Sequence, residues 1–180
     1  AVIDNTAFGY WALRNNTTGI RNTAVGFSAM GLGSGTTTNN TAIGHAVMGS
    51  VQGDQNTGMG AQTLWSLTTG EENTALGAFA MSSDTTGSSN VAVGIGALTN
   101  NVAGNQSTAI GSGAMENAND GATSFTTYNT ALGYQALRGS ATASANTGTN
   151  NTAVGHSAML NTTSGSQNAA LGTLALNSQT

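Results

Sequence analysis

The 180-residue sequence contains no cysteine and no lysine, and three arginines are its only residues with a permanent positive charge. The absence of cysteine excludes disulfides and thiolate metal sites. Three arginines against seven acidic residues leave no electrostatic footprint for nucleic acid. No run of 18 apolar residues occurs, so we expect no membrane insertion by this segment. The sequence shows no initiator Met and no signal peptide, which favours a fragment or a processed product.

Large apolar residues are also scarce. Leu, Ile, Val and Phe together number 29, whereas Gly, Ala, Thr and Asn make up 104 residues. Such a composition is typical of disorder when the chain is highly charged, but the net charge here is only −4. Two readings therefore remain open at this point. The chain is either a flexible low-complexity polymer or a fold that places its few large apolar residues economically.

An internal repeat decides between these readings. The string Asn-Thr-Ala-apolar-Gly-x-x-Ala-Leu/Met occurs ten times, with its marker glycines spaced by 17, 18, 16, 17, 17, 17, 22, 22 and 17 residues. The marker glycines are Gly9, Gly26, Gly44, Gly60, Gly77, Gly94, Gly111, Gly133, Gly155 and Gly172. A period this regular along residues 1–180 predicts a single repeat domain rather than a disordered polymer.

Two apolar columns accompany the repeat, and we predict that both form the core. The residue before the marker glycine is always large and apolar, with Val25, Ile43, Leu76, Val93, Ile110 and Leu132 as clear members. The residue four positions after the glycine is always Leu or Met, as at Met30, Leu98 and Leu137. A Thr two residues before the first column shares its face of an extended strand. Val91 replaces this Thr once, which indicates partial burial.

The slot between the Thr and the first apolar column holds Ala in nine repeats and Gly58 in the tenth. Uniform Ala indicates close approach of another segment, either from the same coil or from a neighbouring chain. β-Turn sterics alone are the remaining explanation. The sequence thus nominates Ala92, Ala131 and Ala153 as chain-interface candidates.

The predicted fold class is all-β, a parallel β-solenoid or β-roll of ten coils of about 17 residues. The marker Gly fits a bend with positive φ, and the leading Asn can form ladders with its copies in stacked coils. Ten coils at ~4.8 Å give a rod roughly 45–50 Å long. Each coil supplies few large apolar residues, so a single chain has a thin core and an oligomer is expected.

The repeats resemble those of known surface fibres. The units NTAVG (22–26 and 151–155), NTAIG (40–44) and NVAVG (90–94), each followed by x-x-Ala-Leu/Met, are similar to head repeats of trimeric autotransporter adhesins. They are still more similar to the NTAVG-x-x-AL repeats of bacteriophage tail fibres and related surface proteins. The resemblance covers about residues 4–177. It implies a left-handed β-roll, a homotrimeric fibre, an extracellular or virion location, and a role in attachment.

The sequence offers little for catalysis or for cofactors. The acidic residues lie mostly in linkers, and the adjacent Glu71 and Glu72 would point to opposite faces of an extended strand. We therefore expect no catalytic residue, no cofactor and no metal. His45 and His156 both follow a marker glycine, and a metal site across a trimer axis is a minor alternative to a variable surface position.

Two linkers are longer than the rest, at residues 116–128 and 138–150. Insertions in a solenoid project from one face, which is often the binding face. Phe125 and Tyr128 in the first insertion are the ligand-contact candidates, with folding back onto the roll as an equal alternative. Trp11 and Trp65 are more consistent with packing at a coil edge or chain interface than with ligand binding.

These observations favour a non-catalytic structural or adhesive fibre segment of an extracellular attachment protein, either a bacterial adhesin or a phage tail fibre. A host surface glycan or protein receptor is the expected external partner. The alternatives are a subunit of a self-assembling extracellular filament and an ice- or glycan-binding β-solenoid. For ice binding, the expected signature is a regular outward Thr-x-Thr array.

Overall fold

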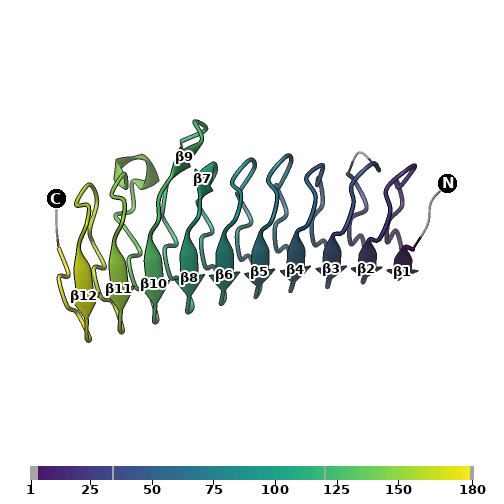
Figure 1. Cartoon of the computed structure of the whole chain (residues 1–180). Helices are drawn as coiled ribbons and strands as arrows, with labels where there is room; N and C mark the ends of the chain where they lie inside the picture. Colours follow the sequence, from purple (N-terminus) through teal and green to yellow (C-terminus); the bar gives the residue numbers. More distant parts are fainter. Residues whose placement is uncertain (1–3, 34, 120, 179–180) are drawn as a thin grey trace.

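The computed structural model describes residues 4–33, 35–119 and 121–178 and shows a parallel β-solenoid of ten coils (Figure 1). The coils stack side by side into a rod, with the two termini at opposite ends. Ten three-residue strands form one sheet along the rod: β1 Thr6–Phe8, β2 Thr23–Val25, β3 Thr41–Ile43, β4 Thr57–Met59, β5 Thr74–Leu76, β6 Val91–Val93, β8 Thr108–Ile110, β10 Thr130–Leu132, β11 Thr152–Val154 and β12 Ala169–Leu171. The predicted all-β solenoid is confirmed.

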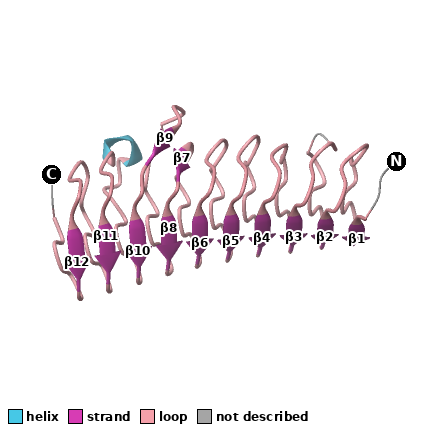
Figure 2. Cartoon of the chain, viewed as in Figure 1, coloured by secondary structure: helices cyan, strands magenta, loops and turns pink. Residues whose placement is uncertain are grey.

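The few other elements lie on the loop side of the rod (Figure 2). Strand β7 (Gly104–Asn105) pairs with β9 (Phe125–Thr126) in a second, two-stranded parallel sheet. A single 3₁₀ turn, η1 (Ala143–Ala145), lies in the second insertion. Both insertions therefore carry local structure of their own, while the main sheet passes beneath them unchanged.

Strand register follows the repeat column by column. Thr23 pairs with Thr41, and Ala24 pairs with Ala42. The same register holds across the two 22-residue repeats, where Thr130 pairs with Thr108 on one side and with Thr152 on the other. Every column of the sequence is therefore a straight row along the rod, and the extra residues of the insertions are confined to the loops.

The marker glycines turn the chain at the end of each strand. Their φ values lie between 123° and 138°, a region that side-chain-bearing residues rarely adopt. The first nine also lie directly against the next coil: a Cβ built on Gly94 would be 2.5 Å from the carbonyl oxygen of Gly111. Both the conformation and the stacking distance thus require glycine, as the sequence predicted.

The Leu/Met column has a backbone conformation that explains its restricted composition. Its members have left-handed φ values, for example 50° at Met30, 52° at Leu98 and 48° at Leu137. A β-branched side chain is a steric outlier in this region, whereas Leu and Met branch or extend further from the backbone. The column therefore excludes Val and Ile although both are as apolar as Leu.

We predict that Leu98→Ile lowers the free energy of unfolding by about 2 kcal/mol, although it conserves every atom type and the side-chain volume. Leu98→Met is the matched control, since the column itself uses Met, and it should change stability by less than about 1 kcal/mol. Urea unfolding followed by circular dichroism measures both. Equal stability of the two variants would contradict the backbone explanation.

The core lies inside each coil and is built from the Leu/Met column and two Ala columns. Met30, Leu98 and Leu137 are buried, which confirms the prediction for this column. The Ala three residues after the marker glycine is buried with them, as at Ala97 and Ala136. One long flexible side chain per coil thus packs against small ones, and further apolar side chains add to this core in the third and fourth coils.

The residue before the marker glycine is not in this core, and here the sequence-based prediction is wrong. Ile110 and Leu132 are exposed, the latter to 46 %. The other predicted core members of the column are only half-buried: Val25, Ile43, Leu76 and Val93. Strand alternation sends them outward together with the Thr, because the Ala between them points inward.

The Ala slot of the strand is correspondingly interior. Ala92, Ala131 and Ala153 each have 0 % of their surface exposed and belong to the same core cluster as the Leu/Met column. They therefore cannot touch another chain, and their nomination as interface residues was wrong. Of the explanations that uniform Ala left open, close approach of another segment of the same coil is the one observed.

The leading Asn residues form a buried ladder through the rod. The side-chain Oδ1 of Asn22 accepts the backbone N–H of Asn40 at 2.9 Å, and that of Asn40 accepts the N–H of Asn56 at 2.8 Å. In most coils the Nδ2 donates to a backbone carbonyl on the loop side, as from Asn56 to Gly70 at 2.9 Å. The predicted ladder exists, but it alternates side-chain and backbone groups. It satisfies polar groups that would otherwise be costly to bury.

Candidate functional site

The outer face of the ten-stranded sheet is a regular surface that runs along the rod. Its strands present two rows of side chains, Thr and large apolar, because the intervening Ala points inward. None of the ten strands of this sheet carries a charged residue. We call these two rows the outer strip. Several of its apolar members are among the most exposed large side chains, including Phe8, Met59, Leu132 and Leu171.

Aromatic side chains extend the outer strip around the marker-glycine corner. Tyr10, Phe27 and His45, the residues after three successive marker glycines, stack with ring centroids 5.7 Å and 5.3 Å apart. Trp11 stacks on Tyr10 at 4.7 Å, and the Arg14 guanidinium lies 4.6 Å from the centre of the Trp11 ring. In-register stacking thus forms a ladder of rings over the first three coils of this column.

The two histidines occupy the surface positions that the sequence favoured. His156 stacks on Tyr134 at 5.4 Å, several coils away from His45, and both histidines are exposed. Within residues 4–33, 35–119 and 121–178, no three His, Asp or Glu side chains gather as a metal site would require. Trp65 packs across the coil edge, since its ring lies 2.4 Å from where a Cβ on Gly49 would be.

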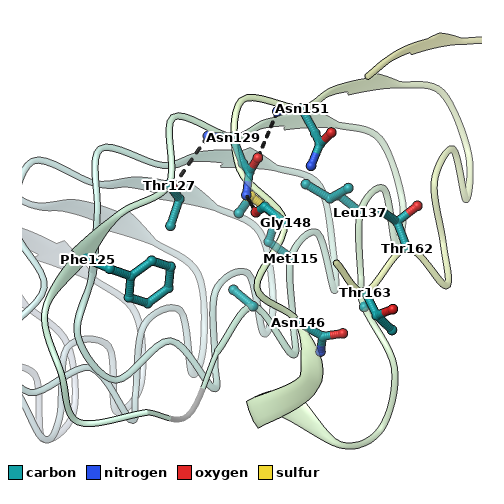
Figure 3. Close-up of a pocket in the computed structure, with 12 residues that line it drawn as sticks. Met115, Phe125, Thr127, Asn129, Leu137, Asn146, Gly148, Asn151, Thr162 and Thr163 are labelled. Carbon is teal, nitrogen blue, oxygen red and sulfur yellow. Dashed lines mark hydrogen bonds between the residues drawn. The ribbon is translucent and has the colours of Figure 1, made fainter. Parts of the chain in front are cut away.

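The two insertions enclose a recess on the loop side of the rod, between the coils that follow Gly111, Gly133 and Gly155 (Figure 3). It is small, because Met115, Leu137 and Thr162, which line it, are each exposed to 7 % or less. Phe125, one of the two predicted ligand-contact residues, is half-buried and lines this recess. Tyr128, the other, is 58 % exposed and does not line it. The first insertion therefore directs its two aromatic residues to different places.

One position of the loop half of the coil lines the recess in two of these coils. The seventh residue after the marker glycine, which we call the inner loop position, is Val51 in the third coil and Leu67 in the fourth, and both fill the core. The same position holds Ala118 and Thr162 at the recess, and both line it. Sequence reasoning missed this position, although aligning the linkers on the marker glycines would have shown it.

An exception in the Asn ladder attaches the first insertion to the rod. Ser107 replaces the leading Asn, and its hydroxyl bonds to that of Thr127 at 2.5 Å. Thr127 Oγ1 then accepts the backbone N–H of Asn129 at 3.4 Å, a role that Asn Oδ1 has in the other coils. The insertion thus contributes a residue to the ladder, and this holds Phe125, two residues earlier, over the recess.

Asp84 is a buried acidic side chain with a strongly altered environment. It occupies the inner loop position of the fifth coil, and desolvation raises its pKa to about 7 in spite of hydrogen bonds from the Gly87 N–H and the Asn101 amide. No other His, Asp or Glu lines the recess or adjoins Asp84 in these contacts, so a paired acid and base is not formed.

Comparison with protein-family models, with curated proteins and with solved structures finds no match to any of them. In the described part of the chain, no helix is both long and apolar enough to cross a bilayer. The outer strip, the recess and the repeat itself are therefore the features that bear on function.

Proposed function

We propose that this chain is a non-catalytic structural and adhesive segment of an extracellular attachment fibre, assembled from three identical chains. The outer strip is the observation that carries the proposal. Exposed apolar side chains that line up along one face of a protein mark interaction sites. The number of chains, the left hand of the roll, and a bacterial or phage surface as its location rest on the resemblance of the repeats.

A further copy of the same chain is the partner that fits the outer strip best. In eight of the ten coils the strip repeats one Thr and one apolar side chain, at the spacing of adjacent β-strands, and Val91 and Ala169 replace the Thr in the other two. Another surface can make the same contact with every coil if its side chains repeat at the same spacing, and an identical chain has that spacing. Closed symmetry about the rod axis would cover the strip of each chain without leaving one exposed.

The proposal predicts a native mass of three times 17.7 kDa in solution. The double variant Ile110→Lys/Leu132→Lys should lower the mass to that of one chain, because two buried charges per chain would lie at the interface. Both residues are exposed in the single chain, so its β-sheet circular dichroism should persist. Native mass spectrometry and sedimentation velocity measure these quantities.

Leu32→Lys is the matched control, since Leu32 is equally exposed but lies on a loop away from the strands. It should leave the three-chain mass unchanged. A wild-type chain that stays monomeric at all concentrations would remove the trimer from the proposal. An open series of masses would instead favour the self-assembling filament.

Ice binding is the second candidate, and the outward direction of the Thr row favours it. The Thr side chains stand in register on a straight sheet, which is the regular array that ice-binding solenoids require. The partner row is apolar rather than Thr, which departs from the expected Thr-x-Thr pattern. Thermal hysteresis of a monomeric chain, lost in the double Lys variant, would favour this candidate over the fibre.

A further inference from the structure

The methionines of the chain occupy two different environments. Five of the six belong to the Leu/Met column, where each is at most 4 % exposed: Met30, Met48, Met81, Met115 and Met159. Met59, in contrast, is 44 % exposed and ends strand β4 in the outer strip. A small solute therefore meets the side chain of Met59 in the folded single chain, whereas the other five are shielded by the core.

Met59 lies within the surface that we assign to contact between chains. Its strand stands in register between β3 and β5, so Met59 pairs with Ile43 on one side and with Leu76 on the other. Both neighbours are half-buried aliphatic residues without a polar side-chain atom. Met59 is also the only sulfur-containing residue of the ten strands of this sheet. A change in the chemistry of its sulfur therefore alters the outer strip at one defined coil.

A thioether is the side chain of the outer strip that a mild oxidant can modify. Hydrogen peroxide transfers one oxygen atom to the sulfur, which gives up two electrons, while the O–O bond breaks and the peroxide is reduced to water. The resulting sulfoxide is polar and accepts hydrogen bonds. Neither Ile43 nor Leu76 has a side-chain donor for it. Covered by another chain, the sulfoxide would carry the cost of a buried polar group without a partner.

We propose that Met59 is an oxidation site that controls assembly of the chain, a role that rests on the fibre proposed above. Oxidation acts on the free chain, where Met59 is exposed, and a second copy lying on the outer strip protects the sulfur. The five core methionines stay reduced, so the oxidised chain keeps its fold and loses only its contact with other copies. Enzymatic reduction of the sulfoxide restores the thioether.

Hydrogen peroxide treatment of the full chain, diluted until it is a single chain, tests the selectivity by peptide mass spectrometry. We expect Met59 to gain one oxygen atom at least about tenfold faster than any buried methionine. In sedimentation velocity, the oxidised chain should assemble with a dissociation constant at least about tenfold larger, while its β-sheet circular dichroism is unchanged. The two methionine sulfoxide reductases, one for each epimer, should restore the value of the untreated chain.

Met59→Leu is the matched control, because Leu occupies the same column at Leu76 and Leu132. It should assemble like the wild type before and after peroxide. Met59→Gln, a polar side chain of similar length, should weaken assembly without any oxidant.

Two results would overturn the proposal. One is oxidation of Met59 no faster than that of the buried methionines. The other is assembly like the untreated wild type by both the oxidised chain and Met59→Gln. The mass of the untreated chain tests the fibre separately: a three-chain mass together with either result removes only the oxidation switch, whereas a single-chain mass at all concentrations removes the fibre and the switch together.

Discussion

Replacing Gly94 by Ala is expected to abolish the stable stacking of the central coils and to lower the free energy of unfolding by more than about 4 kcal/mol. The φ of Gly94 is 135°, which a residue with a Cβ adopts only under strain. The added carbon would also lie 2.5 Å from both the carbonyl carbon and the carbonyl oxygen of Gly111. Those atoms are backbone, so relief requires moving one coil away from the next.

Gly172→Ala separates the two contributions to this effect. Gly172 has a similar φ of 123°, but a Cβ built on it meets nothing within 4 Å. Its replacement should therefore cost only the conformational strain, about 1–2 kcal/mol. Thermal and urea unfolding of both variants measure the difference. If the Gly94→Ala and Gly172→Ala variants lost equal amounts of unfolding free energy, close stacking would not be what requires glycine.

The second large effect concerns pH and buried Asp84. Its carboxyl group occupies a position that Leu67 fills in the preceding coil, and desolvation there raises its pKa from 3.8 to about 7. The folded chain therefore binds a proton at this group more tightly than the unfolded chain does. The resulting stabilisation is fully present below pH 3.8 and is lost as pH rises through about 7. At about 1.4 kcal/mol per pKa unit, the loss is on the order of 4 kcal/mol.

Asp84→Asn should remove this pH dependence. The variant cannot ionise there, so it should be more stable than the wild type at pH 8, by up to about 4 kcal/mol, and similar to it at pH 4. The Asn101 carbonyl oxygen, which has no partner in the described structure, can turn to accept from the new amide. Urea unfolding between pH 4 and pH 8 gives the comparison. Exposed Glu71→Gln is the control and should retain the wild-type slope.

A wild-type stability that is flat between pH 4 and pH 8 would contradict a raised pKa at Asp84. If the free energy of unfolding of the Asp84→Asn variant still changed with pH as in the wild type, another group would be responsible for the titration. Either result leaves the fold as described, because the inner loop position would still be buried.

The sequence was sufficient to predict the architecture, because a solenoid depends on its period and its corners. The marker glycines, the Asn ladder and the Leu/Met column lie where the repeat predicted, even across the two 22-residue repeats. These features are local or depend only on the neighbouring coil. Their spacing in the sequence therefore maps directly onto their spacing along the rod.

Which face of each strand points into the coil could not be predicted in the same way. Alternation groups Thr130 with Leu132 and separates them from Ala131, but it does not say which side is inward. That depends on the opposite layer, where Leu137 and its equivalents already fill the thin coil. The constancy of Ala and the varied size of the apolar column, from Val to Phe, were the available signal. Tight interiors restrict volume, whereas surfaces do not.

The recess and buried Asp84 were missed because linkers were treated as solvated connections. Val51, Leu67, Asp84 and Thr162 occupy one column, yet their chemistry is so varied that no motif shows it. Only the placement of the column inside the coil gives these residues a shared role. Phe125 was identified from the length of its insertion, whereas its separation from Tyr128 depends on the contact between Ser107 and Thr127.

The direction of the strands has a mechanical consequence for a fibre. Strands lie across the rod, so the hydrogen bonds between successive coils run along it (Figure 1). A force pulling on the two ends therefore loads these bonds one coil after another rather than all together. Each coil that detaches releases about 17 residues of chain, roughly 50 Å of extra length. Under tension such a rod lengthens in steps, longer at the two 22-residue repeats, and absorbs work at each one, while the coils that remain stacked keep their structure.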